Sequence, residues 1–278
     1  MPNRSRFAPD ILQHRTDPDL PGLTARLAAY RRQAFALHIH EAWSVGLVLS
    51  GATTVRLSGK AARIEAGSLA CIGPGQPHAC NPVAGTRLGY IMFYLAPEAL
   101  PLVADPAENP AFLSSAVRSR RRSAALVALF RAMGRSASRL EKETLLHQAL
   151  APLFGPGRQA SPRPPAGSDG RKLELVEEYL RTHFRENVSL TELAGLVGLG
   201  PTGLLRRFKA WRGLPPHAFQ NQLRVLAARQ LLEQGRPAAQ VAQEVGFTDQ
   251  SHLIRTFTPL VGATPGQYQQ AQPVSLVR

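Results

Sequence analysis

The feature that most constrains the fold is a degenerate repeat within the last hundred residues. One copy reads SLTELAGLVGLGPTGLLRRFKAWRGLPP, and the other reads RPAAQVAQEVGFTDQSHLIRTFTPLVGATP. Ala194 of the first copy corresponds to Ala242 of the second. Four residues later, Gly198 corresponds to Gly246. Because similarity on this scale is improbable by chance, we expect two copies of one helical supersecondary unit.

Each copy contains the parts of a helix-turn-helix motif. A small alanine lies where two helices would cross, and a glycine at the turn can adopt a positive φ. Ser189 and Glu192 have the spacing of a capping box at the start of the first copy. Pro201 and Asp249 suit the first turns of the two second helices. Residues 217–233 predict one long helix, which would hold the two motifs at a fixed separation.

The second helix of each copy has the pattern of a recognition helix, with an apolar face and a polar face. An exposed arginine on such a helix is usually only solvated. Here a projecting arginine recurs at the same register in both copies, which favours a role in reading the major groove. The predicted DNA-contacting residues are Thr202, Arg206 and Lys209 in the first copy, and Gln250, Ser251, His252 and Arg255 in the second.

The chain divides at a segment rich in Pro, Gly and Ser, GPGRQASPRPPAGSDG, which has the composition of a semi-flexible linker. We predict a β domain at residues 1–96, a helical segment at 97–154, the linker at 155–170, and a DNA-binding domain at 171–271 with motifs at 189–212 and 237–261.

Short apolar runs separated by turn residues fill the first part of the chain. A turn signal about every ten residues is typical of a barrel or sandwich rather than of βαβ units. The sequence therefore predicts a small antiparallel barrel, and an α+β fold of two domains overall. The predicted strands are residues 44–49, 53–57, 62–65, 69–72 and 87–95.

The helical segment carries apolar residues every three or four positions. A stripe of this kind is either packed within the chain or forms the seam of a dimer, and the pattern alone does not decide between them. We expect the segment to dimerise. The stripe consists of Leu140, Leu145, Leu146, Leu150 and Leu153.

Composition limits the class of protein. The 278 residues carry 33 Lys and Arg against 19 Asp and Glu, a net charge of +14 that suits a polyanionic partner. Two cysteines form no disulfide framework, and no apolar stretch reaches the length of a membrane span. We therefore expect a cytoplasmic protein without a membrane role.

The last hundred residues resemble the DNA-binding domain of the AraC/XylS family of bacterial transcription regulators, notably in AARQLLEQGRPAAQVAQEVGFTDQSHLIRTFTPLVGATPGQY. The resemblance implies two recognition helices that enter adjacent major grooves on one face of the DNA. One departure is the run of small residues at 200–203, followed by Leu205 where a polar group is common. We therefore expect the first copy to make fewer contacts with bases than the second.

The spacing of His38-x-His40 and the run GPGQPHACN at 73–81 resemble the two motifs of the cupin barrel, which serves as the ligand-binding domain in the same family. The resemblance implies a small-molecule effector inside the barrel. The candidate effector-binding residues are His38, His40, Trp43, His78 and Tyr90, with Met92 and Tyr94 as further candidates for the cavity wall.

Three imidazoles, His38, His40 and His78, suit a divalent first-row metal. The carboxylate that metal-dependent cupins add is missing from residues 42–46, and Cys80 is a possible substitute. The alternative is a metal-free pocket whose histidines hydrogen-bond or have only a structural role. No cofactor is therefore required by the sequence.

We predict a sequence-specific regulator of transcription that binds double-stranded promoter or operator DNA as a homodimer. It is expected to respond to a small-molecule effector, to activate transcription through RNA polymerase, and to associate with the bacterial nucleoid. The alternative is a DNA-tethered cupin-type metalloenzyme or a metal-sensing regulator. Because no Ser/His/Asp order, phosphate-binding glycine loop or HExxH motif is present, we expect no enzyme activity.

Overall fold

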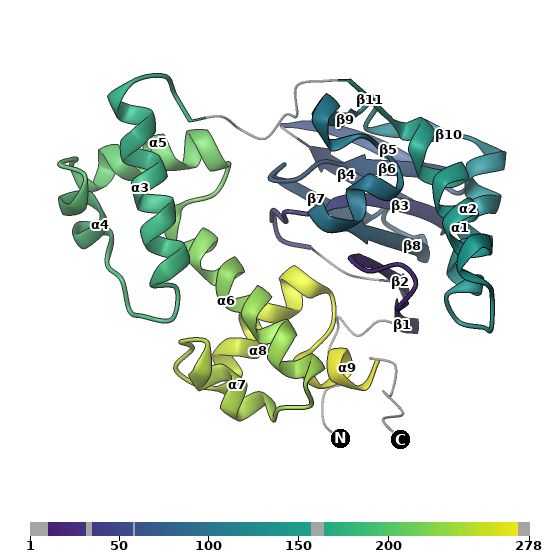
Figure 1. Ribbon diagram of the computed structural model, residues 1–278. Coiled ribbons are helices and arrows are strands. Elements are labelled where there is room, and N and C mark those ends of the chain that lie inside the picture. Colours follow the sequence, from purple (N-terminus) through teal and green to yellow (C-terminus); the bar gives the residue numbers. More distant parts are fainter. Residues whose placement is uncertain (1–10, 32–34, 58, 157–163, 272–278) are drawn as a thin grey trace. The chain divides into compact units, whose positions relative to one another are not determined.

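The computed structural model describes residues 11–31, 35–57, 59–156 and 164–271. The chain forms two compact units (Figure 1). One unit contains the strands together with helices α1 and α2, and the other contains helices α3 to α9. Among the described residues, no helix has both the length and the hydrophobicity needed to cross a membrane.

The strands of the first unit pair antiparallel in three sheets. The largest has the order β1-β2-β8-β3-β6-β10, the second has the order β5-β4-β7, and β11 pairs with β9. The bounds are β1 Ile11–Thr16, β2 Leu23–Tyr30, β3 Trp43–Ser50, β4 Ala52–Leu57, β5 Lys60–Glu65, β6 Ser68–Ile72, β7 His78–Pro82, β8 Leu88–Leu95, β9 Pro110–Phe112, β10 Ala116–Arg118 and β11 Phe154–Pro156.

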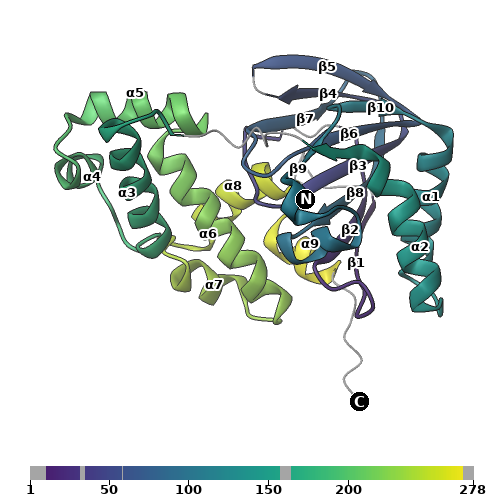
Figure 2. The ribbon, with the colours of Figure 1, turned by 45° about the horizontal axis from the view of Figure 1, so that its top comes forward.

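The antiparallel β fold predicted for this part is confirmed, and the predicted strands match β3, β4, β5, β6 and β8 to within two residues. Two features differ from the prediction. Strands β1, β2, β7, β9, β10 and β11 were not expected, and β9 and β10 lie within the segment predicted to be helical. The hydrogen-bonded pairs among the described residues also form separate sheets rather than one closed barrel. Figure 2 shows the sheet of β4, β5 and β7 lying over the larger sheet.

One face of the large sheet is covered by two helices, α1 (Arg120–Ala132) and α2 (Arg139–Leu150). Buried residues of β3 and β8, such as Leu47 and Phe93, form one core with Leu126 and Leu146 of the helices. Burial of large aliphatic and aromatic side chains on this scale is the main stabilising contribution in the unit.

The leucine stripe is largely packed within the chain. Leu146, Leu150 and Leu153 are buried against the sheet, and Leu145 packs at the edge of the same core. Only Leu140 stays outside, with 74% of its surface exposed. The intramolecular alternative therefore accounts for most of the stripe.

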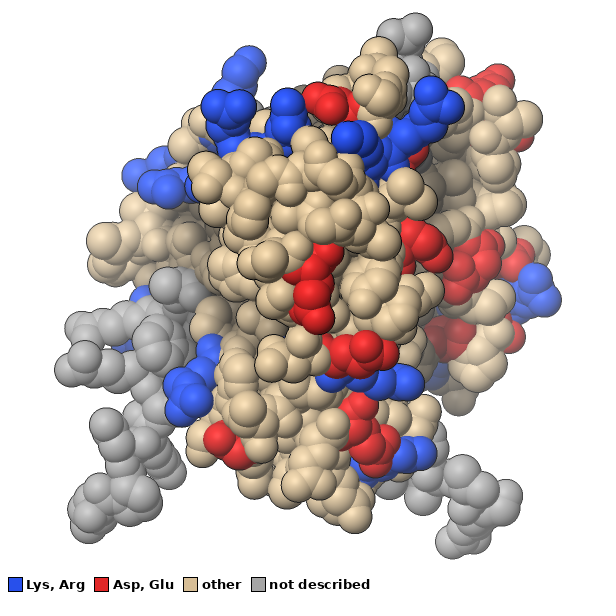
Figure 3. Space-filling view, turned by 90° about the vertical axis from the view of Figure 1, so that its left-hand side faces the viewer, with Lys and Arg blue, Asp and Glu red and all other residues tan. Residues whose placement is uncertain are grey.

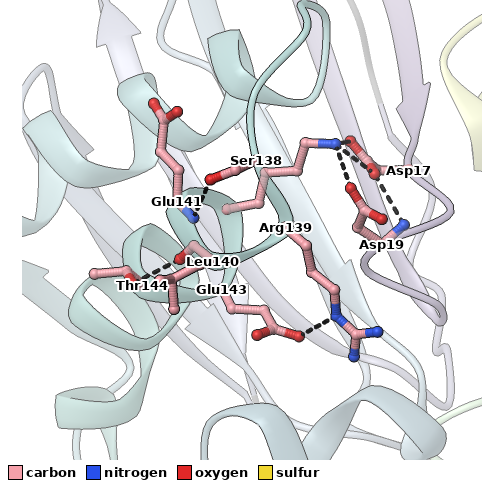
Figure 4. Close-up of polar contacts among 9 residues, drawn as sticks. Asp17, Asp19, Ser138, Arg139, Leu140, Glu141, Glu143 and Thr144 are labelled. Carbon is pink, nitrogen blue, oxygen red and sulfur yellow. Dashed lines mark hydrogen bonds and ion pairs between the residues drawn. The ribbon is translucent and has the colours of Figure 1, made fainter.

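A buried ion cluster joins α2 to the loop after β1 (Figure 4). The Lys142 ammonium lies 2.7 Å from a carboxylate oxygen of Asp17 and 2.9 Å from one of Asp19. These hydrogen bonds raise the pKa of Lys142. Since Lys142 and Asp17 are both buried, removing either partner would leave an uncompensated charge in the interior.

The helices of the second unit lie within residues 168–270, and residues 35–39 also belong to this unit. Its helices are α3 Ser168–Thr182, α4 Leu190–Leu196, α5 Pro201–Arg212, α6 Pro216–Glu233, α7 Ala238–Glu244, α8 Gln250–Val261 and α9 Pro265–Gln270. The repeat is visible as the pairs α4–α5 and α7–α8, and α6 is the long connecting helix predicted at 217–233. The recognition helices α5 and α8 both end at a glycine in the left-handed region, Gly213 with φ 72° and Gly262 with φ 78°.

The predicted linker is shorter at both ends than its composition indicates. Residues 155 and 156 belong to β11, and α3 begins at Ser168. The middle of the predicted linker, residues 157–163, lies outside the described residues.

Candidate nucleic-acid interface and ligand-binding face

Helix α5 presents the polar face that the sequence predicts. Leu204, Phe208 and Trp211 are buried, as expected for the inner face. Thr202, Arg206 and Lys209 are all exposed. The helix begins at Gly200, which supplies no side-chain cap, and Pro201 occupies the first turn.

Helix α8 presents Gln250, Ser251 and Arg255, which are exposed. The carboxylate of Asp249 caps the helix by accepting a hydrogen bond of 2.7 Å from the backbone N–H of His252. This hydrogen bond lowers the pKa of Asp249. The helix therefore starts at a fixed position, with its polar side chains directed outward from the first turn.

His252 differs from the other residues predicted to contact DNA. Its Nδ1 lies 3.1 Å from the hydroxyl of Thr248, and its ring packs edge-on against Phe247 with centroids 5.0 Å apart. The side chain is half-buried. These contacts show that His252 also supports the start of α8.

On the face that carries α3, α4 and α5, Lys and Arg side chains gather along the top of the view, and Asp and Glu lie across its middle (Figure 3). Arg207 of α5 pairs with Asp169 at 3.3 Å. Arg206 and Lys209 form no ion pair with any described residue. Their charge therefore attracts anions outside the unit, as phosphate contact requires.

The first unit has a second polar region, on the face of the large sheet opposite α1 and α2. Thr24, Ser44 and Tyr94 pair with one another across β2, β8 and β3 and so share this face. Tyr90 lies on the same side, four residues before Tyr94 in β8. It is buried, and burial raises its pKa well above the usual value.

Trp43 does not lie on this face. It pairs with Leu95 and belongs to the core under α1 and α2. The structure therefore corrects the prediction that Trp43 lines the same cavity as Tyr90. Alternation along one strand cannot reveal this, because the face depends on the register between β3 and β8.

Two residues on the Tyr90 face were not predicted from the sequence. Arg26 is buried and donates a hydrogen bond to the hydroxyl of Tyr30, and the Tyr30 ring stacks on Tyr90 with centroids 6.0 Å apart. Burial raises the pKa of Tyr30, so its hydroxyl stays protonated at neutral pH. Arg26 and Tyr30 are four residues apart, so in a strand they lie on the same face. The sequence could have placed them together if residues 23–30 had been recognised as a strand.

Two of the predicted histidines come together near this face. The rings of His40 and His78 are 4.6 Å apart between centroids, and Tyr94 packs edge-on against His40 at 5.7 Å. His40 and His78 belong to the unit of strands, whereas residues 35–39, which include His38, belong to the helical unit.

In each of the three histidines, Nδ1 lies within hydrogen-bonding distance of a backbone carbonyl oxygen. The distances are 2.9 Å from His38 to Ala36, 3.0 Å from His40 to Ala42, and 2.8 Å from His78 to Gln76. A neutral imidazole that donates from Nδ1 carries its lone pair on Nε2. Nε2 of His40 lies 3.2 Å from the Ser44 hydroxyl, which can donate to this lone pair. His40 and His78 thus suit either a hydrogen-bonding ligand or a borderline metal ion that prefers nitrogen ligands.

Cys80 fits a metal site less well than its position in the sequence suggests. Burial raises the pKa of its thiol to about 12, so the thiol stays protonated at neutral pH. Among the described residues, neither Cys80 nor a carboxylate is grouped with His40 and His78 as a candidate metal ligand.

Both units match known protein families. The AraC-like ligand binding domain matches residues 20–150, and a helix-turn-helix domain matches residues 193–271. The chain is 27% identical to the uncharacterized HTH-type transcriptional regulator YbfI of Bacillus subtilis (strain 168), over 82% of this chain and 86% of YbfI. It is 30% identical to the HTH-type transcriptional activator RhaS of Enterobacter sp. (strain 638), over 38% of each chain.

The fold is also found among solved structures. The unsaturated fatty acid-bound ToxT of Vibrio cholerae strain SCE256 matches with a TM-score of 0.56 at 10% identity, over 90% of this chain and 95% of ToxT. At this level of identity the match concerns the fold alone. An AraC-like ligand-binding domain is thus followed by a helix-turn-helix domain, and the chain belongs to the AraC family of transcriptional regulators.

Proposed function

We propose that this protein activates transcription by binding a bipartite site on double-stranded DNA, with α5 and α8 in successive major grooves. The observation that carries the proposal is the pair of matched helices, each with a buried apolar face and exposed polar residues at equivalent register. Arg206 and Arg255 supply the bidentate donors that suit guanine. Thr202, Lys209, Gln250, Ser251 and His252 complete the proposed contact set.

The proposed effector is a small molecule held on the polar face of the large sheet, near His40, His78 and Tyr90. The AraC-like ligand-binding domain supports this role, and a fatty acid is bound by ToxT, which has the same fold. YbfI and RhaS are named only as regulators of transcription, which supports a binding role. A third relative, AdaA of Bacillus subtilis (strain 168), is named as both an activator and a DNA repair enzyme, and it matches 44% of this chain.

We further infer that the protein acts as a homodimer on chromosomal DNA in the bacterial cytoplasm and contacts RNA polymerase. The exposed Leu140 of α2 is the candidate dimer contact within residues 97–154. An effector would shift the dimer between two states, by no more than its difference in affinity for them.

The decisive test is selection of binding sites from random DNA, followed by a salt titration on the selected sequences. We expect two short half-elements about one helical turn apart, and we expect an Arg206→Ala/Arg255→Ala double variant to lose them. Diffuse binding that depends only on salt would contradict sequence-specific readout.

A second candidate is that the effector is a metal ion. The specific observation in its favour is that His40 and His78, whose rings are in contact, both have Nδ1 placed at a carbonyl oxygen. Elemental analysis after loading with Zn²⁺, Ni²⁺ or Cu²⁺ tests this. Replacement of His78 with Ala should abolish stoichiometric metal, whereas replacement of the exposed His147 should not.

A further inference from the structure

The two helix-turn-helix motifs have separate hydrophobic cores. Leu204 and Phe208 belong to the core of the first motif, and Leu253 and Phe257 belong to that of the second. Helix α6 contributes to both, and passes from one motif to the other (Figure 1). No shared apolar core therefore fixes the position of α5 relative to α8.

Two buried polar residues of α6 lie between these cores. Gln220 is 7% exposed and Arg224 is 8% exposed. They are four residues apart and so share one face of the helix. In the sequence of α6 they fall between Phe219, which packs in the first core, and Val225, which packs in the second.

Both side chains bind the turn that follows α3. The Arg224 guanidinium donates at 2.6 Å to the carbonyl oxygen of Phe184 and at 2.8 Å to that of Glu186. The Gln220 amide donates to the same two carbonyls, at 3.2 Å and 2.9 Å. Four hydrogen bonds thus attach α6 to the segment that leads into the first motif.

The other side of this turn contacts the second motif. Gly246, at the turn between α7 and α8, has φ 89°, and a Cβ placed there would come within 2.1 Å of the Arg185 carbonyl oxygen. Only glycine permits both the backbone conformation and the close approach. The turn at 184–186 is therefore held between α6 and the second motif.

Arg224 also reaches the second motif directly. Its guanidinium lies over the Phe247 ring, 5.6 Å from the centroid. Phe247 in turn packs against the ring of His252, in the first turn of α8. A continuous set of contacts thus runs from the turn before α4 to the start of the second recognition helix.

We propose that Gln220 and Arg224 form a polar seam that sets the position of α8 relative to α5, and so determines which spacing of DNA half-elements the protein accepts. The inference rests on the proposed reading of DNA by both helices. Burying a guanidinium against carbonyls is a costly way to fill space, since apolar residues would stabilise as well. The hydrogen bonds of Gln220 and Arg224 instead hold α6 in one position relative to the turn at 184–186.

The effect on DNA binding is expected to be large, because the spacing between two half-elements on a double helix also sets the angle between them. With about 10 base pairs per turn, one inserted base pair turns the second half-element by about 35° and moves it by about 3.4 Å. A rigid pair of recognition helices cannot follow this change. A loosened pair would bind the original site less well but would tolerate altered spacing.

The experiment compares spacing variants of the selected site, with one base pair removed or with one or two added, using the full chain. For Arg224→Met we expect about a tenfold loss on the original spacing and little loss on the altered ones, so that the preference for spacing collapses. Gln220→Met should do the same to a smaller degree, and it also serves if Arg224→Met folds poorly. Helical content and thermal unfolding check the fold of each variant.

Arg229→Met is the matched control. Arg229 lies on the same helix, but it donates at 3.0 Å to the hydroxyl of Tyr268 in α9, which packs in the core of the second motif. A stability effect alone should lower affinity by the same factor at every spacing, and we expect that result for this variant.

Two failures can be told apart. If the unaltered chain shows no preference for any spacing, the proposed two-helix readout itself is wrong. If the unaltered chain does prefer one spacing, and folded Arg224→Met and Gln220→Met variants keep that preference in full, then the seam inference is overturned while the proposed function stands.

Discussion

The two helix-turn-helix copies differ most at the first turn of their recognition helices. Helix α8 is capped by the Asp249 carboxylate, and His252 and Thr248 add a further contact. Helix α5 begins at Gly200 with no side-chain cap. Its exposed face also includes Leu205, which can form no hydrogen bond. This difference supports the expectation that the first copy reads fewer bases than the second.

The sharpest way to break this comparison is Arg255→Ala. Loss of a bidentate base contact should cost about 1 to 3 kcal/mol on the selected site and relax discrimination at one base pair. Titration of the variant on the selected site and on random DNA measures both effects. An equal loss on the two DNAs would mean that Arg255 contacts only phosphate.

Lys209→Ala should give the contrasting result in the first copy. Because Lys209 is exposed and forms no ion pair with a described residue, its loss should weaken binding to all sequences evenly. The slope of log K against log salt should fall by about one unit. A sequence-dependent loss would assign Lys209 to base readout and weaken the contrast between the copies.

Asp249→Asn tests whether the cap fixes the start of α8. The hydrogen bond from His252 lowers the pKa of Asp249 in the folded state. A carboxyl with a lowered pKa stabilises the fold above its unfolded value of about 3.9, and this contribution is lost as the pH falls through the lower folded value. Between pH 5 and pH 2, the melting temperature should therefore fall less steeply for Asp249→Asn than for the unaltered protein. Identical profiles would contradict a role for the cap charge.

Gly200→Ser should have the smallest effect. Gly200 has an extended conformation, φ −71° and ψ 147°, and a Cβ there meets no atom within 4 Å. A serine can therefore add the missing cap, and it should stabilise the second unit by a few tenths of a kcal/mol. Denaturant unfolding measures this gain. A loss of stability would show that α5 needs glycine at its start for another reason.

The helical unit was predictable from sequence because its signals are local. Ser189 and Glu192 form the capping box that their spacing indicates, and α6 begins within one residue of the predicted position. Strand β2 was missed for the opposite reason. Its sequence, LTARLAAY, alternates apolar and polar residues only as far as Leu27, and its last three residues are buried on both faces. Its place in the sheet is therefore set by pairing with the distant strand β8.

The candidate ligand-binding face was only partly predictable. His40 and His78 could be paired through the resemblance to cupins, but the side on which Trp43 lies depends on the register between β3 and β8. What covers Leu146 and leaves Leu140 exposed likewise depends on packing between distant segments. Neither the Arg224 contacts nor the Gly246 approach leaves any mark in a local pattern.

The separation of the two cores in the helical unit has a consequence for how such proteins diverge. A substitution that loosens the packing around Phe257 leaves the packing around Phe208 intact, because the two clusters share no residue. Each motif can therefore change its sequence independently, and with it the DNA half-element that it recognises. The residues that must change together are those of α6, which belongs to both halves, and those at which the turn at 184–186 meets Gly246.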